Sequence, residues 1–83
     1  MNGPCTAEDG GRKILAIYGF HHVLAGEMLL FQTLQICFED TNAYYNHDAL
    51  LSGLTWLEEN GFIEQKDGRN GMFFLTKKGA MAL

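Results

Sequence analysis

The chain has 83 residues, a length that suits one small domain. Hydrophobic residues make up 47% of it, which is enough for a packed core and excludes a disordered chain. The formal net charge is −4, which argues against a strong binder of polyanions. The charge is unevenly distributed, because residues 1–65 have a net charge of −7 and residues 66–83 have a net charge of +3.

Residues 1–11 contain the only proline and three of the ten glycines. We interpret them as a flexible N-terminal tail that precedes a single domain over residues 12–83. The tail lacks the basic and apolar regions of a secretory signal, and no apolar run approaches the roughly 20 residues of a membrane span. Two cysteines, Cys5 and Cys37, do not make a disulfide framework. We therefore expect a cytoplasmic protein without a membrane segment.

Two amphipathic helices are predicted after the tail. Residues 12–25 have apolar residues on one helical face, although Gly19 weakens this helix and a break at residues 19–22 is the alternative. That face comprises Ile14, Ile17, Tyr18, His21 and Leu24. Residues 26–40 form a better helix, with a wide apolar stripe opposite a polar one. The apolar stripe comprises Leu30, Leu34, Cys37 and Phe38.

A third helix is predicted over residues 47–60, with Asn46 as its N-cap and Gly61 as a left-handed C-cap. Four leucines are spaced to face the core from this helix, namely Leu50, Leu51, Leu54 and Leu57.

A hairpin and a short helix are predicted after the third helix. The segments at 62–65 and 72–76 are predicted strands, because "KDGRNG" between them contains Asp-Gly and Asn-Gly pairs typical of hairpin turns. Thr76 then caps a short helix over residues 77–83. The predicted fold is therefore mainly α with a small β-hairpin.

The segments "LTWLEENGFIEQ" and "KDGRNGMFFLTKKG" resemble the end of the third helix and the wing of MarR-like and PadR-like bacterial transcriptional regulators. The resemblance covers residues 47–79. It implies a winged helix-turn-helix fold, with three helices followed by a two-stranded wing and a short C-terminal helix. The chain departs from the pattern at "EDTNAYYN", where about eight residues separate two helices that a turn of three or four usually joins. We expect either an extra helical turn or an irregular helix-turn-helix here.

The resemblance also implies a DNA-binding surface, because the third helix of such domains enters the major groove. The polar residues at hand for such contacts are Asn46, His47, Ser52 and Thr55. However, Asp48, Glu58 and Glu59 would repel phosphate. A solvated face of a purely structural helix is an equal alternative.

The wing carries the basic residues that the third helix lacks, namely Lys66, Arg69, Lys77 and Lys78. A wing arginine can enter a minor groove, and lysines add salt-dependent contacts to phosphate. The alternative is that these charges serve only solubility.

Alternation along the second predicted strand puts Phe73 and Leu75 on one face, with Met72 and Phe74 on the other. One of these faces should be exposed unless a partner covers it. Core packing is the simpler interpretation, but an exposed patch of Trp56, Met72 and Phe74 would indicate a protein interface.

Other chemistry is not indicated by the sequence. There is no Cys-x-x-Cys or His-x-x-x-His pair for a metal, and Cys37 lies in an apolar stripe where a thiol is a poor nucleophile. We expect no enzyme, metal or cofactor. The first hypothesis is a small homodimeric DNA-binding protein, a transcriptional regulator that contacts double-stranded DNA. The alternative is a winged-helix module that binds another protein and no DNA.

Overall fold

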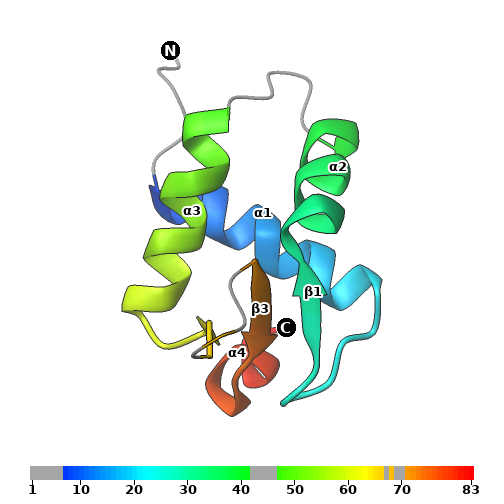
Figure 1. Cartoon of the computed structure of the whole chain (residues 1–83), viewed down its shortest axis with the longest axis vertical. Coiled ribbons are helices and arrows are strands. Elements are labelled where there is room, and N and C mark those ends of the chain that lie inside the picture. The colour runs from blue at the N-terminus through cyan, green and yellow to red at the C-terminus, as the bar shows by residue number, and fades with distance from the viewer. Residues whose placement is uncertain (1–6, 42–46, 67, 69–70) are drawn as a thin grey trace.

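The computed structural model describes residues 7–41, 47–66, 68 and 71–83. The chain is mainly helical with a small three-stranded antiparallel sheet (Figure 1). The helices α2 and α3 lie on either side of the central strand, and α1 crosses behind them. In chain order the elements are α1 (Ala7–Phe20), β1 (Met28–Leu30), α2 (Phe31–Thr41), α3 (His47–Glu59), β2 (Ile63–Glu64), β3 (Met72–Leu75) and α4 (Lys77–Met81).

The sheet contains a strand, β1, that the sequence did not predict. The strand order is β1-β3-β2, so β3 is paired on both sides, with Met28 opposite Phe74 and Ile63 opposite Leu75. Two further bonds extend the β1–β3 pairing, because the Gly26 amide donates to the Leu75 carbonyl at 2.7 Å and the Leu75 amide donates to the Glu27 carbonyl at 2.8 Å. The predicted helix over residues 26–40 was therefore wrong at its start, and α2 begins only at Phe31.

The first helix begins at Ala7, five residues earlier than predicted. Its first turns pack directly against α3 through glycine. A Cβ atom at Gly10 would lie 2.7 Å from the Ala49 carbonyl oxygen, and one at Gly53 would lie 2.7 Å from the Gly10 carbonyl carbon. The glycines that suggested a loose tail therefore allow two helix backbones to touch. The rest of the predicted tail, residues 1–6, lies outside the described residues.

The helices α1 and α3 end with the same pattern of hydrogen bonds. At the end of α3, the Gly61 amide donates to the Glu58 carbonyl and the Phe62 amide to the Leu57 carbonyl, with Gly61 at φ 76°. This is a Schellman C-cap, and the prediction for Gly61 is confirmed. At the end of α1 the left-handed position is His22, at φ 55°. The alternative of a break at residues 19–22 is therefore confirmed, and the predicted extension of this helix to residue 25 was wrong, because α1 ends at Phe20.

The core lies between the three long helices and one face of the sheet. Side chains that are at most 1% exposed come from every layer: Ile14, Tyr18, Leu34, Phe38, Leu50, Leu57, Ile63 and Leu75. The Tyr18 hydroxyl donates to the Phe73 carbonyl at 2.8 Å, which links α1 to the central strand. Four residues predicted on apolar faces are instead exposed, and one of them is Leu30, the last residue of β1. His21 and Leu24 follow the end of α1, and Leu51 points away from the core because it is rotated by about 100° from Leu50.

Candidate interaction surface on helix α3 and the hairpin

The outward face of α3 carries acidic and hydroxyl side chains and one leucine. Its exposed residues recur at intervals of three and four and therefore share one side of the helix. They are Asp48, Leu51, Ser52, Thr55 and Glu59. The helix contains no lysine or arginine. Ser52 and Thr55 thus lie on the predicted face, but between carboxylates. Asn46 lies outside the described residues, and of His47 only the backbone, as the first residue of α3, is described.

A hollow of about 320 Å³ lies on this face, where α3 meets the start of α1. It is lined by Ala7, Leu51, Ser52, Thr55, Trp56 and Glu59. Trp56 is half-buried, and its ring centroid lies 5.6 Å from that of Phe62 and 5.9 Å from the Arg12 guanidinium. The Trp56 ring therefore forms an apolar side of the hollow, next to the hydroxyls of Ser52 and Thr55 and the carboxylate of Glu59.

Sequence reasoning missed two parts of this hollow. Ala7 was assigned to the tail, and no local signal contradicted that assignment. Leu51 was assigned to the core, although its position four residues before Thr55 places it on the exposed side.

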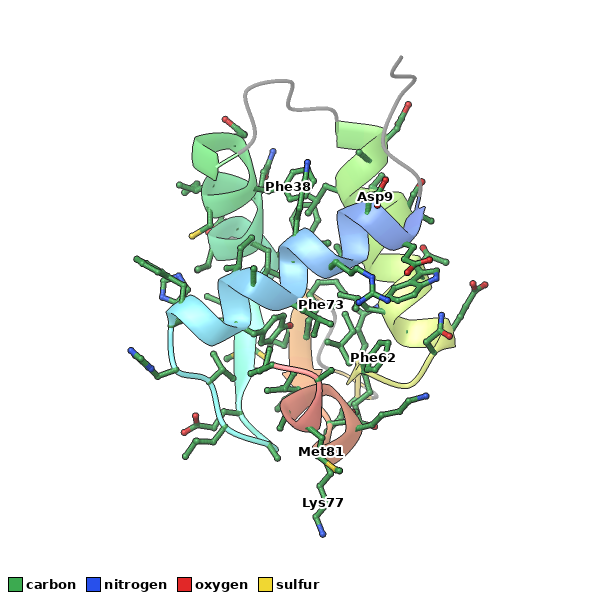
Figure 2. All side chains as sticks on the ribbon, turned by 180° about the vertical axis from the view of Figure 1, so that it is seen from behind. Asp9, Phe38, Phe62, Phe73, Lys77 and Met81 are labelled. Atoms are coloured by element: carbon green, nitrogen blue, oxygen red, sulfur yellow. The ribbon has the colours of Figure 1, made fainter. Side chains whose placement is uncertain are left out.

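The basic residues of the hairpin do not gather on the outward face of α3. Lys66 is exposed, with its ammonium 4.5 Å from the centroid of the Phe74 ring. The Lys78 ammonium donates to the Asn60 carbonyl at 2.6 Å, at the C-terminal end of α3. Lys77 is exposed and points away from the body of the molecule at the α4 end (Figure 2). Arg69 lies outside the described residues.

The patch predicted from Trp56, Met72 and Phe74 is not an exposed apolar surface. Phe74 is only 9% exposed, and Trp56 and Met72 are half-buried. The reason is β1, which pairs with β3 so that Phe74 lies in a central strand, with the Lys66 ammonium over its ring. On the same face of the sheet, Leu30 lies opposite Met72 and is 43% exposed, so this face is only partly covered.

Three ionisable groups outside this face have notable surroundings. The His21 Nε2 atom lies 3.4 Å from the Cys37 Sγ atom, and Cys37 is half-buried. Burial raises the pKa of Tyr18 well above its ordinary value, and the nearby negative charge of Glu58 raises it further.

The described part of the chain holds no group of three or more His, Cys, Asp or Glu side chains that suits a metal ion. Within the same residues, no helix has the length and apolar character needed to cross a membrane. No protein-family model, curated protein or solved structure matches the chain. Its function is therefore inferred from the surface of α3 itself.

Proposed function

We propose that the chain is a winged helix-turn-helix domain that binds a protein through the outward face of α3. The element order supports the fold, because a hairpin follows the third helix and its second strand also pairs with a strand between the first two helices. In this fold the hairpin is the wing, and α3 is the helix that presents a binding surface.

The charge of α3 is the observation that carries the choice of a protein partner. Asp48 and Glu59 lie on the exposed face, Glu58 is half-buried beside it, and α3 itself contains no lysine or arginine. In a major groove these carboxylates would lie within a Debye length of about 8 Å of phosphates and would be repelled. Base readout also relies on Arg, Lys, Asn or Gln side chains, which the described face does not offer.

The hollow beside Trp56 gives this face something that a protein can bind. Leu51 is 43% exposed and Trp56 is half-buried, so an incoming apolar side chain would remove both from water. Tryptophan in a partly closed pocket is typical of the residues that dominate binding energy at interfaces. Glu59 at the rim favours a partner with basic residues around its apolar anchor.

Differential capture tests the protein-binding proposal. The wild-type chain, Leu51→Glu and Ile36→Glu are immobilised and exposed to the same cell extract. Ile36 is a matched control, because it is 61% exposed on α2, away from the hollow. We expect one protein to be retained by the wild type and by Ile36→Glu and lost from Leu51→Glu. Identical retention by all three chains would overturn the proposal.

DNA binding through the hairpin is the second candidate, favoured by the resemblance to the regulators and by the exposed position of Lys66 before the turn. Titration with a random-sequence duplex at low and at physiological salt separates the two candidates. A hairpin-anchored DNA binder would lose affinity steeply with salt, and Lys66→Ala would reduce the salt slope by about one. We expect no binding of the duplex even at low salt.

A further inference from the structure

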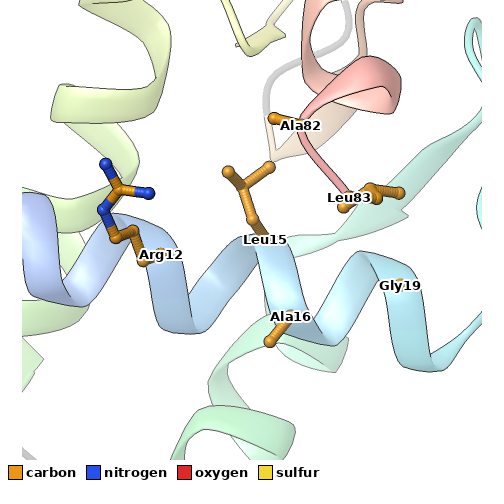
Figure 3. Close-up of a pocket in the computed structure, with 6 residues that line it drawn as sticks. All are labelled: Arg12, Leu15, Ala16, Gly19, Ala82 and Leu83. Carbon is orange, nitrogen blue, oxygen red and sulfur yellow. The ribbon is translucent and has the colours of Figure 1, made fainter.

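Helix α1 borders two surfaces of different chemistry. One is a groove of about 280 Å³ between α1 and the last residues of the chain (Figure 3). Its charged lining residue, Arg12, is already bound to Glu8 at 2.7 Å. The other surface lies where the end of α1 meets α2, and there the His21 Nε2 atom is 3.4 Å from the Cys37 Sγ atom. A thiol and an imidazole at this distance are a nucleophile and a base in position to exchange a proton.

The His21 imidazole is held in place by its neighbours in α1. The His21 amide donates to the Ile17 carbonyl at 3.0 Å, at the end of the helix. The Phe20 ring lies edge-on to the imidazole, with the ring centroids 5.4 Å apart and an angle of 85° between the planes. His21 is nevertheless exposed. The fold therefore positions the imidazole against the thiol and leaves it in contact with water.

Cys37 lies at the border of the apolar stripe of α2. Leu34 and Phe38 are fully buried, whereas Ile36 is 61% exposed, and Cys37 between these sides of the helix is half-buried and outside any disulfide. Reactive cysteines typically lie in such partly exposed places beside a basic side chain. The partial burial of the sulfur admits a small reagent more readily than a folded protein. The position of Cys37 therefore suits modification by a small molecule.

We propose that Cys37 is a site of reversible modification by small aliphatic disulfides, with His21 as the group that takes and returns the proton. The neutral imidazole accepts the thiol proton at Nε2, and the Cys37 thiolate attacks one sulfur of the disulfide. As the new S–S bond forms, the old one breaks, and its electron pair leaves with the second sulfur. That thiolate takes the proton from the His21 imidazolium.

The reaction is balanced without a further oxidant. One protein thiol and one small disulfide become one mixed disulfide and one small thiol, and an excess of thiol reverses the exchange. An aliphatic leaving group suits the pair, because an aliphatic thiolate is basic enough to take up the returned proton. The site is separate from the outward face of α3 and does not depend on the function proposed for it.

Reaction with hydroxyethyl disulfide, an uncharged aliphatic probe, tests the reactivity of the thiol. The full chain carries Cys5→Ser, so that Cys37 is the thiol that reacts, and the mixed disulfide is followed by intact mass. Each rate is divided by that of N-acetylcysteine in the same solution. Since an ordinary thiol is only a few per cent ionised at neutral pH, we expect the folded chain to react about tenfold faster than the chain in urea. A folded chain that reacts no faster than the unfolded one would overturn the proposal.

Two substitutions in the same background test the role of the imidazole. His21→Gln keeps a polar side chain that cannot take up a proton, and it should slow the reaction about tenfold. His22→Asn is the matched control, because His22 is the exposed neighbouring imidazole and asparagine tolerates its φ of 55°. It should leave the rate unchanged. Circular dichroism checks that both variants remain folded. No loss for His21→Gln, or equal losses for the two variants, would overturn the proposal.

A second probe tests the return of the proton. Dipyridyl disulfide has an acidic aromatic leaving thiol, which departs without being protonated. His21→Gln should therefore slow the reaction with dipyridyl disulfide less than it slows the reaction with hydroxyethyl disulfide. A loss of the same size with both probes would contradict the proposed proton transfer to the leaving thiolate.

Discussion

The crossing of α1 with α3 and the end of the molecule formed by β2, β3 and α4 are held together in different ways. At the crossing, Gly10 and Gly53 bring two helix backbones into contact with no side chain between them. At the sheet end, Gly79 also lies against a backbone carbonyl, that of Phe62, but that oxygen accepts a bond from the Thr76 amide at 3.1 Å. Both regions therefore depend on a glycine that leaves no room for a side chain, and hydrogen bonds around Thr76 also hold the sheet end.

The sharpest way to break the crossing is to add one methyl group to it. In Gly53→Ala, the new Cβ would lie 2.7 Å from the Gly10 carbonyl carbon and 2.8 Å from the Gly11 nitrogen. Since both are backbone atoms, the helices must separate. We expect a loss of about 3 kcal/mol in the free energy of unfolding, measured by denaturant titration.

The same substitution at Gly19 is the control, because the nearest atom to a Cβ there is 4.0 Å away. Alanine is the better helix former, so Gly19→Ala should stabilise the chain by up to about 1 kcal/mol. Opposite signs for the two substitutions are the signature of a backbone contact at Gly53. The same sign at both positions would mean that the helices do not meet there.

The crossing also marks where prediction from the sequence stopped. The core positions Leu50, Leu54 and Leu57, the C-cap at Gly61 and the pairing of β2 with β3 follow from local periodicity and turn chemistry. The role of Gly10 could not be predicted from its neighbours in sequence, because glycine locally favours a loop. The contact becomes visible only when Gly53 in α3 is placed opposite Gly10.

The strand β1 was missed for a related reason. It has three residues, too few to display alternation, and methionine and leucine favour a helix locally. Its conformation is set by pairing with β3, far along the chain. The error extended to the candidate site, because the burial of Phe74 follows from that pairing. The exposed positions of Ser52 and Thr55 were predictable, because they follow from the period of α3 alone.

Tyr18 links the two regions. It belongs to α1, and its hydroxyl donates a hydrogen bond to the Phe73 carbonyl in β3. Tyr18→Phe removes a buried hydrogen bond, and we expect a loss of about 1.5 kcal/mol at neutral pH. Denaturant titration of both chains measures it. An unchanged free energy of unfolding would mean that the hydrogen bond from Tyr18 to Phe73 does not stabilise the fold.

Alkaline pH sharpens this test. Burial raises the pKa of Tyr18 in the folded chain above its unfolded value of about 10. The stabilisation by the neutral hydroxyl is therefore fully present below about pH 10 and is lost as pH rises from there towards the folded pKa. Above about pH 10, the wild type should lose stability more steeply than Tyr18→Phe, by up to about 1.4 kcal/mol per pH unit. Parallel curves would contradict the burial of this hydroxyl.

Thr76 tests the sheet end in the complementary way. Its hydroxyl donates to the Gly61 carbonyl at 2.6 Å and accepts from the Gly79 amide at 3.0 Å as the N-cap of α4. Thr76→Val keeps the volume and removes the hydroxyl, and we expect a loss of about 1 kcal/mol by thermal or denaturant unfolding. Thr76→Ser keeps the hydroxyl and should recover most of it. Equal losses for valine and serine would show that packing, not hydrogen bonding, matters there.

Lys78 gives the smallest expected effect and bears directly on function. Its ammonium donates to the Asn60 carbonyl at the C-terminal end of α3, where a positive charge is favourable. Lys78→Met should cost roughly 0.5 kcal/mol at low salt and less at high salt, because the interaction is exposed and screened. Lys77→Met is the matched control, since Lys77 points away from α3, and it should change nothing. Equal, negligible effects would mean that Lys78 does not stabilise α3, and its charge would then be as available to a polyanion as that of Lys77.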